Sequence, residues 1–217
     1  MRKETVEKRF EEYRESLQFE AQRLASYISL YRHLHEKKRD RLNEMNISPA
    51  FFQLTIDALF TATVLWVDKL FGKSSERGFL NFLSFVENNL RVFSIDELKR
   101  RKRYHDGHWM LNREPITFKT IETHRKEIQQ IRSLPNFNLR RDKFHAHFDK
   151  EYFFDRSKLA KDAPIKWGDL SHIVDTMVDI LDTYSAAYDG NVYSLPLFNI
   201  NDVDRTLDML HKCRMKK

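Results

Sequence analysis

Apolar residues recur every three or four positions along most of this chain, which is the spacing of one face of an α-helix. In residues 1–45 the stripe consists of Phe10, Tyr13, Leu17, Ala21, Leu24, Ile28, Tyr31 and His35. No glycine or proline interrupts this segment. It therefore predicts a long amphipathic helix that packs along an antiparallel bundle, and pairing with a second copy of itself is the alternative.

A second helix is expected to begin at Ser48-Pro49 and to end before Gly72, because Ser is a good N-cap and Pro fits the first helical turn. This segment is apolar on most sides, so we expect it to be the central buried helix. Its most apolar stretch, residues 58–67, is shorter than the ~20 residues that cross a bilayer. We therefore expect no membrane association.

The rest of the chain predicts further helices separated by short breaks. Ser94 and Glu97 form a capping-box pattern, Pro135 marks a boundary, and Gly190 ends a well-patterned segment. The expected helices span residues 78–92, 94–104, 117–133, 138 onward with an uncertain end, 169–188 and 202–214. No repeat, low-complexity tract or linker divides the chain. Residues 1–217 therefore predict a single all-α domain, a helical bundle with a long N-terminal helix.

Composition narrows the functional classes. Only 5 Gly and 5 Pro occur in 217 residues, so turn-rich β-sandwiches and Gly-loop nucleotide folds fit poorly. Lys and Arg exceed Asp and Glu by 38 to 32, a mild excess that is compatible with a phosphate-bearing partner. A single cysteine, Cys213, and the lack of a secretory signal favour a reducing, cytoplasmic setting. Motifs for nucleotide hydrolysis, serine hydrolysis and zinc hydrolysis are absent from the sequence.

Residues 140–149, Arg-Arg-Asp-Lys-Phe-His-Ala-His-Phe-Asp, concentrate the groups that could carry chemistry. On a regular helix Arg140, Lys143 and His147 would share one side, and Arg141 and His145 an adjacent side. A fixed cation beside an imidazole suits phosphodiester chemistry, because the cation holds the phosphate and the imidazole transfers protons. A salt-bridged surface is the alternative interpretation, and the working pair stays open between the two arginines and the two histidines.

A second basic segment, followed by Tyr104, lies earlier in the chain. Its cations could follow an RNA backbone while Tyr104 stacks on a base, or they could form a solvated helix face. The five consecutive cations are Lys99, Arg100, Arg101, Lys102 and Arg103.

Metal ligation receives little support from the sequence. His145 and His147 would splay apart on a helix, and His105 with His108 lacks obvious partners. A stripe of His172, Asp175, Asp179 and Asp182 could hold a divalent ion, but a solvated face is the favoured interpretation. We expect neither a metal nor a cofactor.

The motif segment resembles a signature of the HEPN superfamily. Arg141-Asp142-Lys143-x-x-Ala146-His147-x-Asp149 is similar to the Arg-Asp-Lys-x-x-Ala-His-x-Asp pattern of its abortive-infection AbiU-type branch. The run Asp57-x(8)-Trp66-Val67-Asp68-Lys69-Leu70-Phe71 is similar to the apolar central helix of that branch. The resemblance implies a small all-α domain in which Arg141 and His147 occupy the positions of an Arg-x(4–6)-His motif.

The resemblance also implies a function. Active HEPN members are metal-independent endoribonucleases that usually act as dimers, so we expect RNA as substrate and a homodimer in a phage-defence or toxin–antitoxin system, with an antitoxin protein as a further partner. Arg141 would brace the scissile phosphate, His147 would act as general acid or base, and Asp142 would orient one of them. Arg140, Lys143 and His145 would bind RNA. The alternative is a non-catalytic module that binds protein or RNA through the long helix and the basic run.

Overall fold

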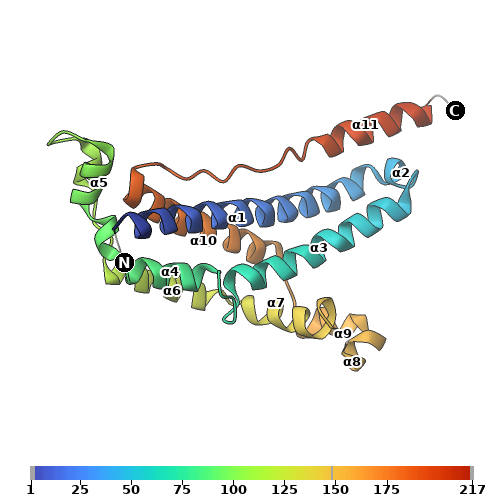
Figure 1. The fold of residues 1–217 in the computed structure, drawn as a ribbon. Helices are drawn as coiled ribbons and strands as arrows, with labels where there is room; N and C mark the ends of the chain where they lie inside the picture. The colour runs from blue at the N-terminus through green and yellow to red at the C-terminus, as the bar shows by residue number, and fades with distance from the viewer. Residues whose placement is uncertain (1–2, 148, 216–217) are drawn as a thin grey trace.

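A computed structural model describes residues 3–147 and 149–215, and these residues contain helices and no strand. The long N-terminal helix is α1, Lys3–Asp40, and the first two residues of the predicted segment lie outside the described residues. A short helix α2, Leu42–Met45, leads to α3, Pro49–Phe71. Helix α1 packs along α3 and along α10, Trp167–Asp189 (Figure 1). These three long helices form the body of the bundle.

Shorter helices cover the two ends of this body. The region after α3 contains α4, Phe79–Glu87, the 3-10 helix η1, Leu90–Phe93, α5, Ile95–Lys102, the 3-10 helix η2, Trp109–Asn112, and α6, Phe118–Gln130. The motif region contains α7, Leu134–Arg140, the π-helix η3, Arg141–His145, α8, Lys150–Phe154, and α9, Arg156–Asp162. Helix α11, Asp202–Met215, packs against α2 at the end of the chain.

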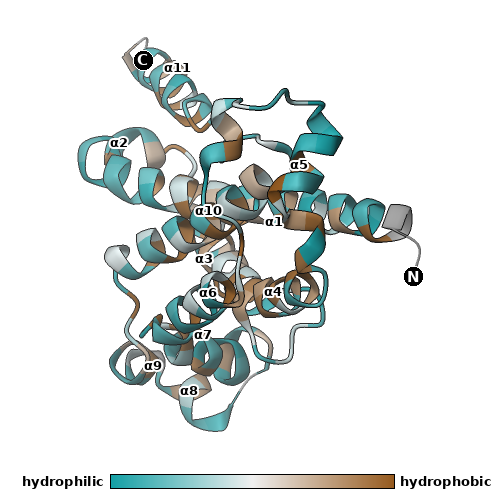
Figure 2. Cartoon of the chain, turned by 90° about the vertical axis from the view of Figure 1, so that its left-hand side faces the viewer, coloured by the Kyte–Doolittle hydropathy of each residue, from teal (hydrophilic) through white to brown (hydrophobic). Residues whose placement is uncertain are grey.

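The all-α prediction is confirmed, and so is most of the apolar stripe on α1. Phe10 contacts the rings of Phe82, Phe93 and Tyr188 with centroid distances of 5.9, 4.9 and 4.5 Å. Hydrophobic residues gather where α1, α3, α4 and α10 meet (Figure 2). Because the chain's own core covers this stripe, the stripe is not available for self-association.

Helix α3 departs from the prediction of a fully buried central helix. Eight of its residues are buried, but Phe51 and Leu54 are 60% and 67% exposed. By length and composition α3 is also long and apolar enough to cross a membrane, and 33% of its most apolar window is buried in the bundle. One side of α3 therefore belongs to the core, and the other presents apolar side chains at the surface.

Two stretches of the chain fold differently from the prediction. The helix expected over residues 78–92 is divided into α4 and η1, and the helix expected from residue 138 onward, whose end the sequence left open, is followed by the two short helices α8 and α9. Asp149 accepts a hydrogen bond from the Glu151 amide, and Asp155 accepts from the Ser157 amide, both at 3.0 Å. These are N-caps, which stabilise even short helices.

Candidate functional site

The motif segment begins as an ordinary α-helix and then widens. Helix α7 ends at Arg140, and Arg141–His145 form one turn of π-helix in which the Ala146 amide donates to the Arg141 carbonyl at 2.8 Å. Single π turns inside helices are rare and occur frequently at functional sites. The regular helix that the sequence suggested is therefore wrong here, and the sides that a regular helix would give to Arg141, His145 and His147 do not apply.

Arg141 lies between two carboxylates. Its Nη1 donates to Asp68 of α3, and its Nε donates to Asp142 at 2.7 Å. These contacts raise the pKa of Arg141, chiefly through the hydrogen bond to Asp68. Asp142 accepts a hydrogen bond from Arg141, and the orienting role proposed for it stays a prediction. Asp68 was not among the predicted site residues, although the run that resembles the AbiU-type central helix contains it.

Arg140 and His145 turn inward to a hollow of about 420 Å³ that Asp57, Phe60 and Thr61 also line. The Arg140 Nε donates to the Ala163 carbonyl at 2.6 Å, and the guanidinium lies 5.3 Å from the centre of the Phe60 ring. Burial lowers the pKa of Arg140. The hollow brings together one of the two arginines and one of the two histidines between which the sequence could not choose.

His145 is held in this hollow as a neutral ring. Its Nδ1 lies 3.1 Å from Thr61 Oγ1, and its buried Nε2 has no hydrogen-bond partner among the described residues. Burial, with a smaller contribution from the Arg140 charge, lowers the pKa of His145 to about 4. A histidine with this pKa carries no charge near neutral pH, so it is poorly suited to proton transfer there.

The outer side of the motif carries the remaining groups. His147 is exposed and makes no hydrogen bond or ion pair with any other described residue. The Lys143 ammonium donates to Asp149 at 2.8 Å, which raises the pKa of Lys143 and lowers that of Asp149. Lys143 is therefore engaged within the motif, whereas the His147 imidazole faces solvent.

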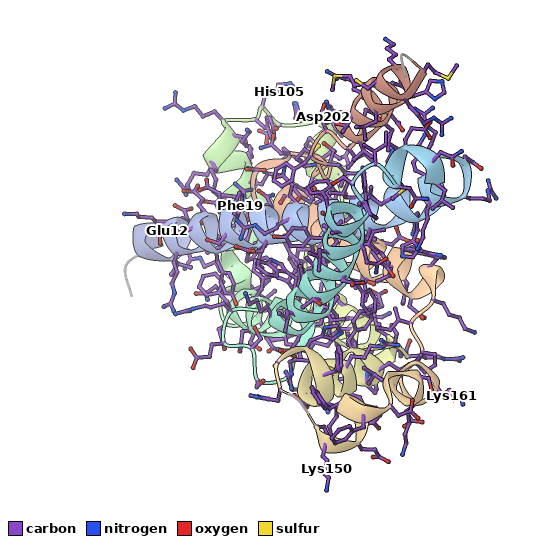
Figure 3. All side chains as sticks on the ribbon, turned by 90° about the vertical axis from the view of Figure 1, so that its right-hand side faces the viewer. Glu12, Phe19, His105, Lys150, Lys161 and Asp202 are labelled. Carbon is purple, nitrogen blue, oxygen red and sulfur yellow. The ribbon has the colours of Figure 1, made fainter. Side chains whose placement is uncertain are left out.

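The basic run lies far from the motif and is largely engaged in ion pairs. Lys99 pairs with Asp106, Arg100 donates to Glu7 at 2.7 Å, and Arg101 donates to the Val92 carbonyl at 3.0 Å. Within the described ranges, only Lys102 and Arg103 of the run have no such partner. Helix α5 and α8 lie at opposite ends of the molecule in Figure 1, as do His105 and Lys150 in Figure 3. The structure therefore does not join the basic run to the motif.

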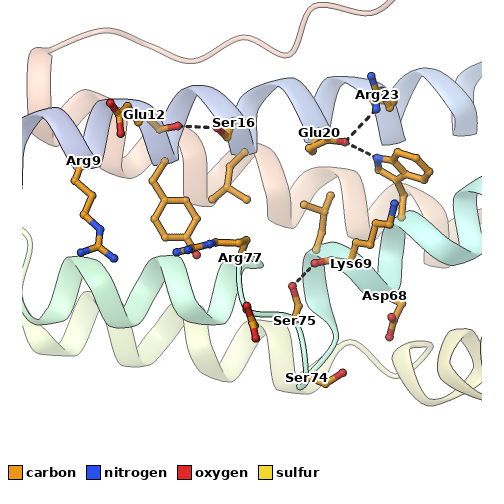
Figure 4. Close-up of a pocket in the computed structure, with 15 residues that line it drawn as sticks. Arg9, Glu12, Ser16, Glu20, Arg23, Asp68, Lys69, Ser74, Ser75 and Arg77 are labelled. Atoms are coloured by element: carbon orange, nitrogen blue, oxygen red, sulfur yellow. Dashed lines mark hydrogen bonds and ion pairs between the residues drawn. The ribbon is translucent and has the colours of Figure 1, made fainter.

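A larger groove of about 860 Å³ runs between α1, α3 and the loop that follows α3 (Figure 4). Trp66 forms part of its wall, where its Nε1 donates to Glu20 at 2.7 Å and the Lys69 ammonium lies 3.9 Å from its ring centre. Asp68, the partner of Arg141, also lines the groove. The lining contains four cationic and four acidic side chains: Arg9, Arg23, Lys69 and Arg77, with Glu12, Glu20, Asp68 and Glu76. Charge alone therefore gives this groove no preference for a polyanion.

Comparison with known proteins identifies the family. A family model described as AbiU2 (HEPN_AbiU2) matches residues 7–208. No curated protein and no solved structure matches the chain. The match covers nearly the whole bundle, including the π-helical motif and the Asp68 that pairs with its arginine. The chain therefore belongs to the HEPN AbiU2 family.

Proposed function

We propose that this HEPN AbiU2 protein is a metal-independent endoribonuclease of a phage-defence or toxin–antitoxin system and acts in the cytoplasm. The observation that carries the proposal is the motif itself, in which the Arg141 guanidinium, oriented by Asp142, begins a π turn and the solvent-exposed His147 follows it. A guanidinium stabilises the negative charge that develops on a phosphate, and an imidazole transfers protons at neutral pH.

Arg141 is the residue that braces the scissile phosphate. Asp68 and Asp142 fix its position before substrate arrives, which removes part of the entropic cost of ordering a long side chain. Each Nη atom of an arginine carries two hydrogens, so the contacts to the two carboxylates leave donors for phosphate oxygens. Asp142 and Asp68 are positioning residues in this scheme.

His147 transfers the protons. As a neutral ring it accepts the proton of a ribose 2′-hydroxyl, and the 2′-oxygen attacks the adjacent phosphorus while the bond to the 5′-oxygen breaks. A protonated imidazole then donates to the leaving 5′-oxygen, which yields a 2′,3′-cyclic phosphate and a free 5′-hydroxyl end. DNA lacks the 2′-hydroxyl and resists this reaction.

A homodimer supplies the second imidazole. In this scheme one copy of His147 acts as the base and the partner's His147 acts as the acid. Support comes from the exposed apolar side of α3, with Phe51 and Leu54, because α3 packs directly beside α7 and η3. An interface on this side would bury apolar surface and bring two motif regions near each other.

The non-catalytic alternative has less support. It relies on the long helix and the basic run, but the apolar stripe of α1 is buried in the core and three of the five basic side chains are ion-paired within the chain. RNA contacts then fall to the exposed Lys102 and Arg103 and to the motif itself. An antitoxin protein that covers the motif would block such an enzyme.

The test is cleavage of a single-stranded RNA in EDTA by the wild type, Arg141→Ala and His147→Ala. We expect both variants to lose at least 100-fold in rate, and a DNA of the same sequence to stay intact. Arg132→Ala and His105→Ala, which change exposed residues outside the motif, are the matched controls. Product analysis should find 2′,3′-cyclic phosphate ends.

Two results would overturn the assignment of Arg141 and His147 as the catalytic pair, and a third would overturn the dimeric site. Cleavage that persists in both motif variants removes Arg141 and His147 from the mechanism. Loss in His145→Ala but not in His147→Ala, with an unchanged circular dichroism spectrum, transfers the chemistry to the inner pair of Arg140 and His145. Sedimentation of wild type as a monomer at active concentrations would exclude the composite site.

A further inference from the structure

Three potential metal ligands meet between α6 and α10, apart from the residues of the proposed nuclease site. His124 and Glu127 come from α6 and Asp179 from α10, and one ligand atom from each lies within 4.8 Å of the other two. His124 and Glu127 are three residues apart, which places them on the same face of their helix. Asp179 belongs to the acidic stripe of α10, and only the fold brings it to the histidine.

The histidine of this cluster is buried and fixed at both ring nitrogens. His124 is 5% exposed, and its Nδ1 lies 2.9 Å from the hydroxyl of Tyr184. Its Nε2 points to Asp179 Oδ2 at 3.2 Å. A second hydrogen bond that fixes the ring orientation is the usual arrangement of a metal-binding histidine. A tyrosine hydroxyl can either donate to Nδ1 or accept from it.

Within the part of the chain that the structure describes, the two carboxylates of the cluster form no ion pair with Lys or Arg. Arg125 donates to Glu87 at 2.6 Å, and Lys126 pairs with Glu122 at 3.7 Å. Among the described residues Glu127 makes no hydrogen bond or ion pair, and the only ion pair of Asp179 is with His124. Two negative charges therefore face a single imidazole, and a divalent cation would neutralise them.

We propose that His124, Glu127 and Asp179 bind a divalent first-row transition-metal ion such as Zn²⁺. An imidazole nitrogen with two carboxylate oxygens suits such ions, whereas Mg²⁺ and Ca²⁺ prefer oxygen ligands alone. When the metal binds Nε2, the proton of the neutral ring resides on Nδ1 and is donated to the Tyr184 oxygen. The remaining coordination positions face solvent and take water.

The bound ion would join α6 to α10. Helix α6 continues through residues 131–133 into α7, which carries the motif, so the ion would stabilise the support of the motif without entering the chemistry. This inference does not rest on the proposed nuclease activity, because the ligands belong to a separate cluster.

The experiment uses untagged full-length protein that has been treated with EDTA and dialysed. Titration calorimetry with ZnCl₂ should show one bound ion per chain. At a ZnCl₂ concentration a hundredfold above the Kd, the Tm of thermal unfolding should rise by about 5–10 °C. Affinity should fall at least tenfold in each ligand variant. The ligand variants are His124→Gln, Glu127→Gln and Asp179→Asn, and the matched controls on the same two helices are Glu122→Gln, Asp175→Asn and His172→Gln.

A further variant, Tyr184→Phe, distinguishes a built metal site from nonspecific binding of Zn²⁺ at the surface. Tyr184→Phe keeps the ring and removes the hydroxyl, and we expect about 10- to 100-fold weaker Zn²⁺ binding. The proposal is wrong if wild type binds no stoichiometric Zn²⁺, if MgCl₂ produces the same thermal shift, or if the controls lose as much affinity as the ligand variants. Because Glu127 and Asp179 are not buried, their variants remain informative even if His124→Gln fails to fold.

Discussion

The partly buried ring of His145 predicts how folding stability changes with pH. In the unfolded chain this imidazole takes up a proton near its ordinary pKa of 6.5, but in the folded chain it resists protonation until about pH 4. Between these values the unfolded state binds more protons than the folded state. The stability that depends on the neutral ring is therefore complete above pH 6.5 and is lost as the pH falls towards 4.

The size of this effect follows from the difference between the two pKa values. At 1.36 kcal/mol per pKa unit, the fall from 6.5 to about 4 has an upper limit of about 3.4 kcal/mol. The ring is only partly shielded from water, and screening reduces the effect. We therefore expect His145 to account for about 1 kcal/mol of lost stability between neutral solution and pH 5, and for about 2 kcal/mol at pH 4.

The assay is urea unfolding followed by circular dichroism at several pH values between 7 and 4. His145→Gln cannot take up the proton, so its stability should fall less steeply than that of the wild type below pH 6.5. His105→Gln removes an exposed histidine and should keep the wild-type slope. Parallel curves for the wild type and His145→Gln would refute the assignment of His145 as a neutral ring in the folded chain.

Three further predictions concern other parts of the molecule. Asp68→Asn weakens the hold on Arg141, so the cleavage rate under the proposed mechanism should fall about 10- to 100-fold in single-turnover kinetics; an unchanged rate would exclude a positioning role. Phe10→Ala removes a fully buried ring and should lower the free energy of unfolding by roughly 3–5 kcal/mol in urea. Arg101→Ala leaves the Val92 carbonyl without its side-chain donor and should cost about 1–3 kcal/mol in the same assay, whereas its exposed neighbour Lys102→Ala should stay within about 0.5 kcal/mol.

Most of the fold prediction came from the helical spacing of apolar residues. The stripe on α1 is readable because a period of 3.6 residues places Phe10, Leu17, Leu24 and Ile28 on the buried side. Helices α8 and α9 were not predicted as separate helices because they are too short to show a period. Their signals were instead the N-cap aspartates, Asp149 and Asp155. A π turn produces no periodic pattern of apolar residues, so the sequence predicted a regular α-helix for the motif.

The sequence located the candidate site but not its internal contacts. The resemblance of residues 141–149 to the AbiU-type pattern indicated the motif, and the AbiU2 family model includes this segment. The roles of its residues stay a prediction. The partner of Arg141, however, is Asp68, which lies 73 positions earlier in the chain. Arg100 similarly meets Glu7 across 93 positions. Such pairs depend on how whole helices pack, and a local pattern cannot indicate whether a cation is free or neutralised.

The π turn has a consequence for how this segment tolerates insertions and deletions. One additional residue within a helical turn rotates everything that follows it by about 100° relative to an uninterrupted α-helix. Removal of any single residue from 141–145 would let the backbone close into a regular helix and turn the downstream histidine away from its present direction. The direction of His147 thus depends on the number of residues in the turn. A deletion in this segment would therefore alter the site more than many substitutions there.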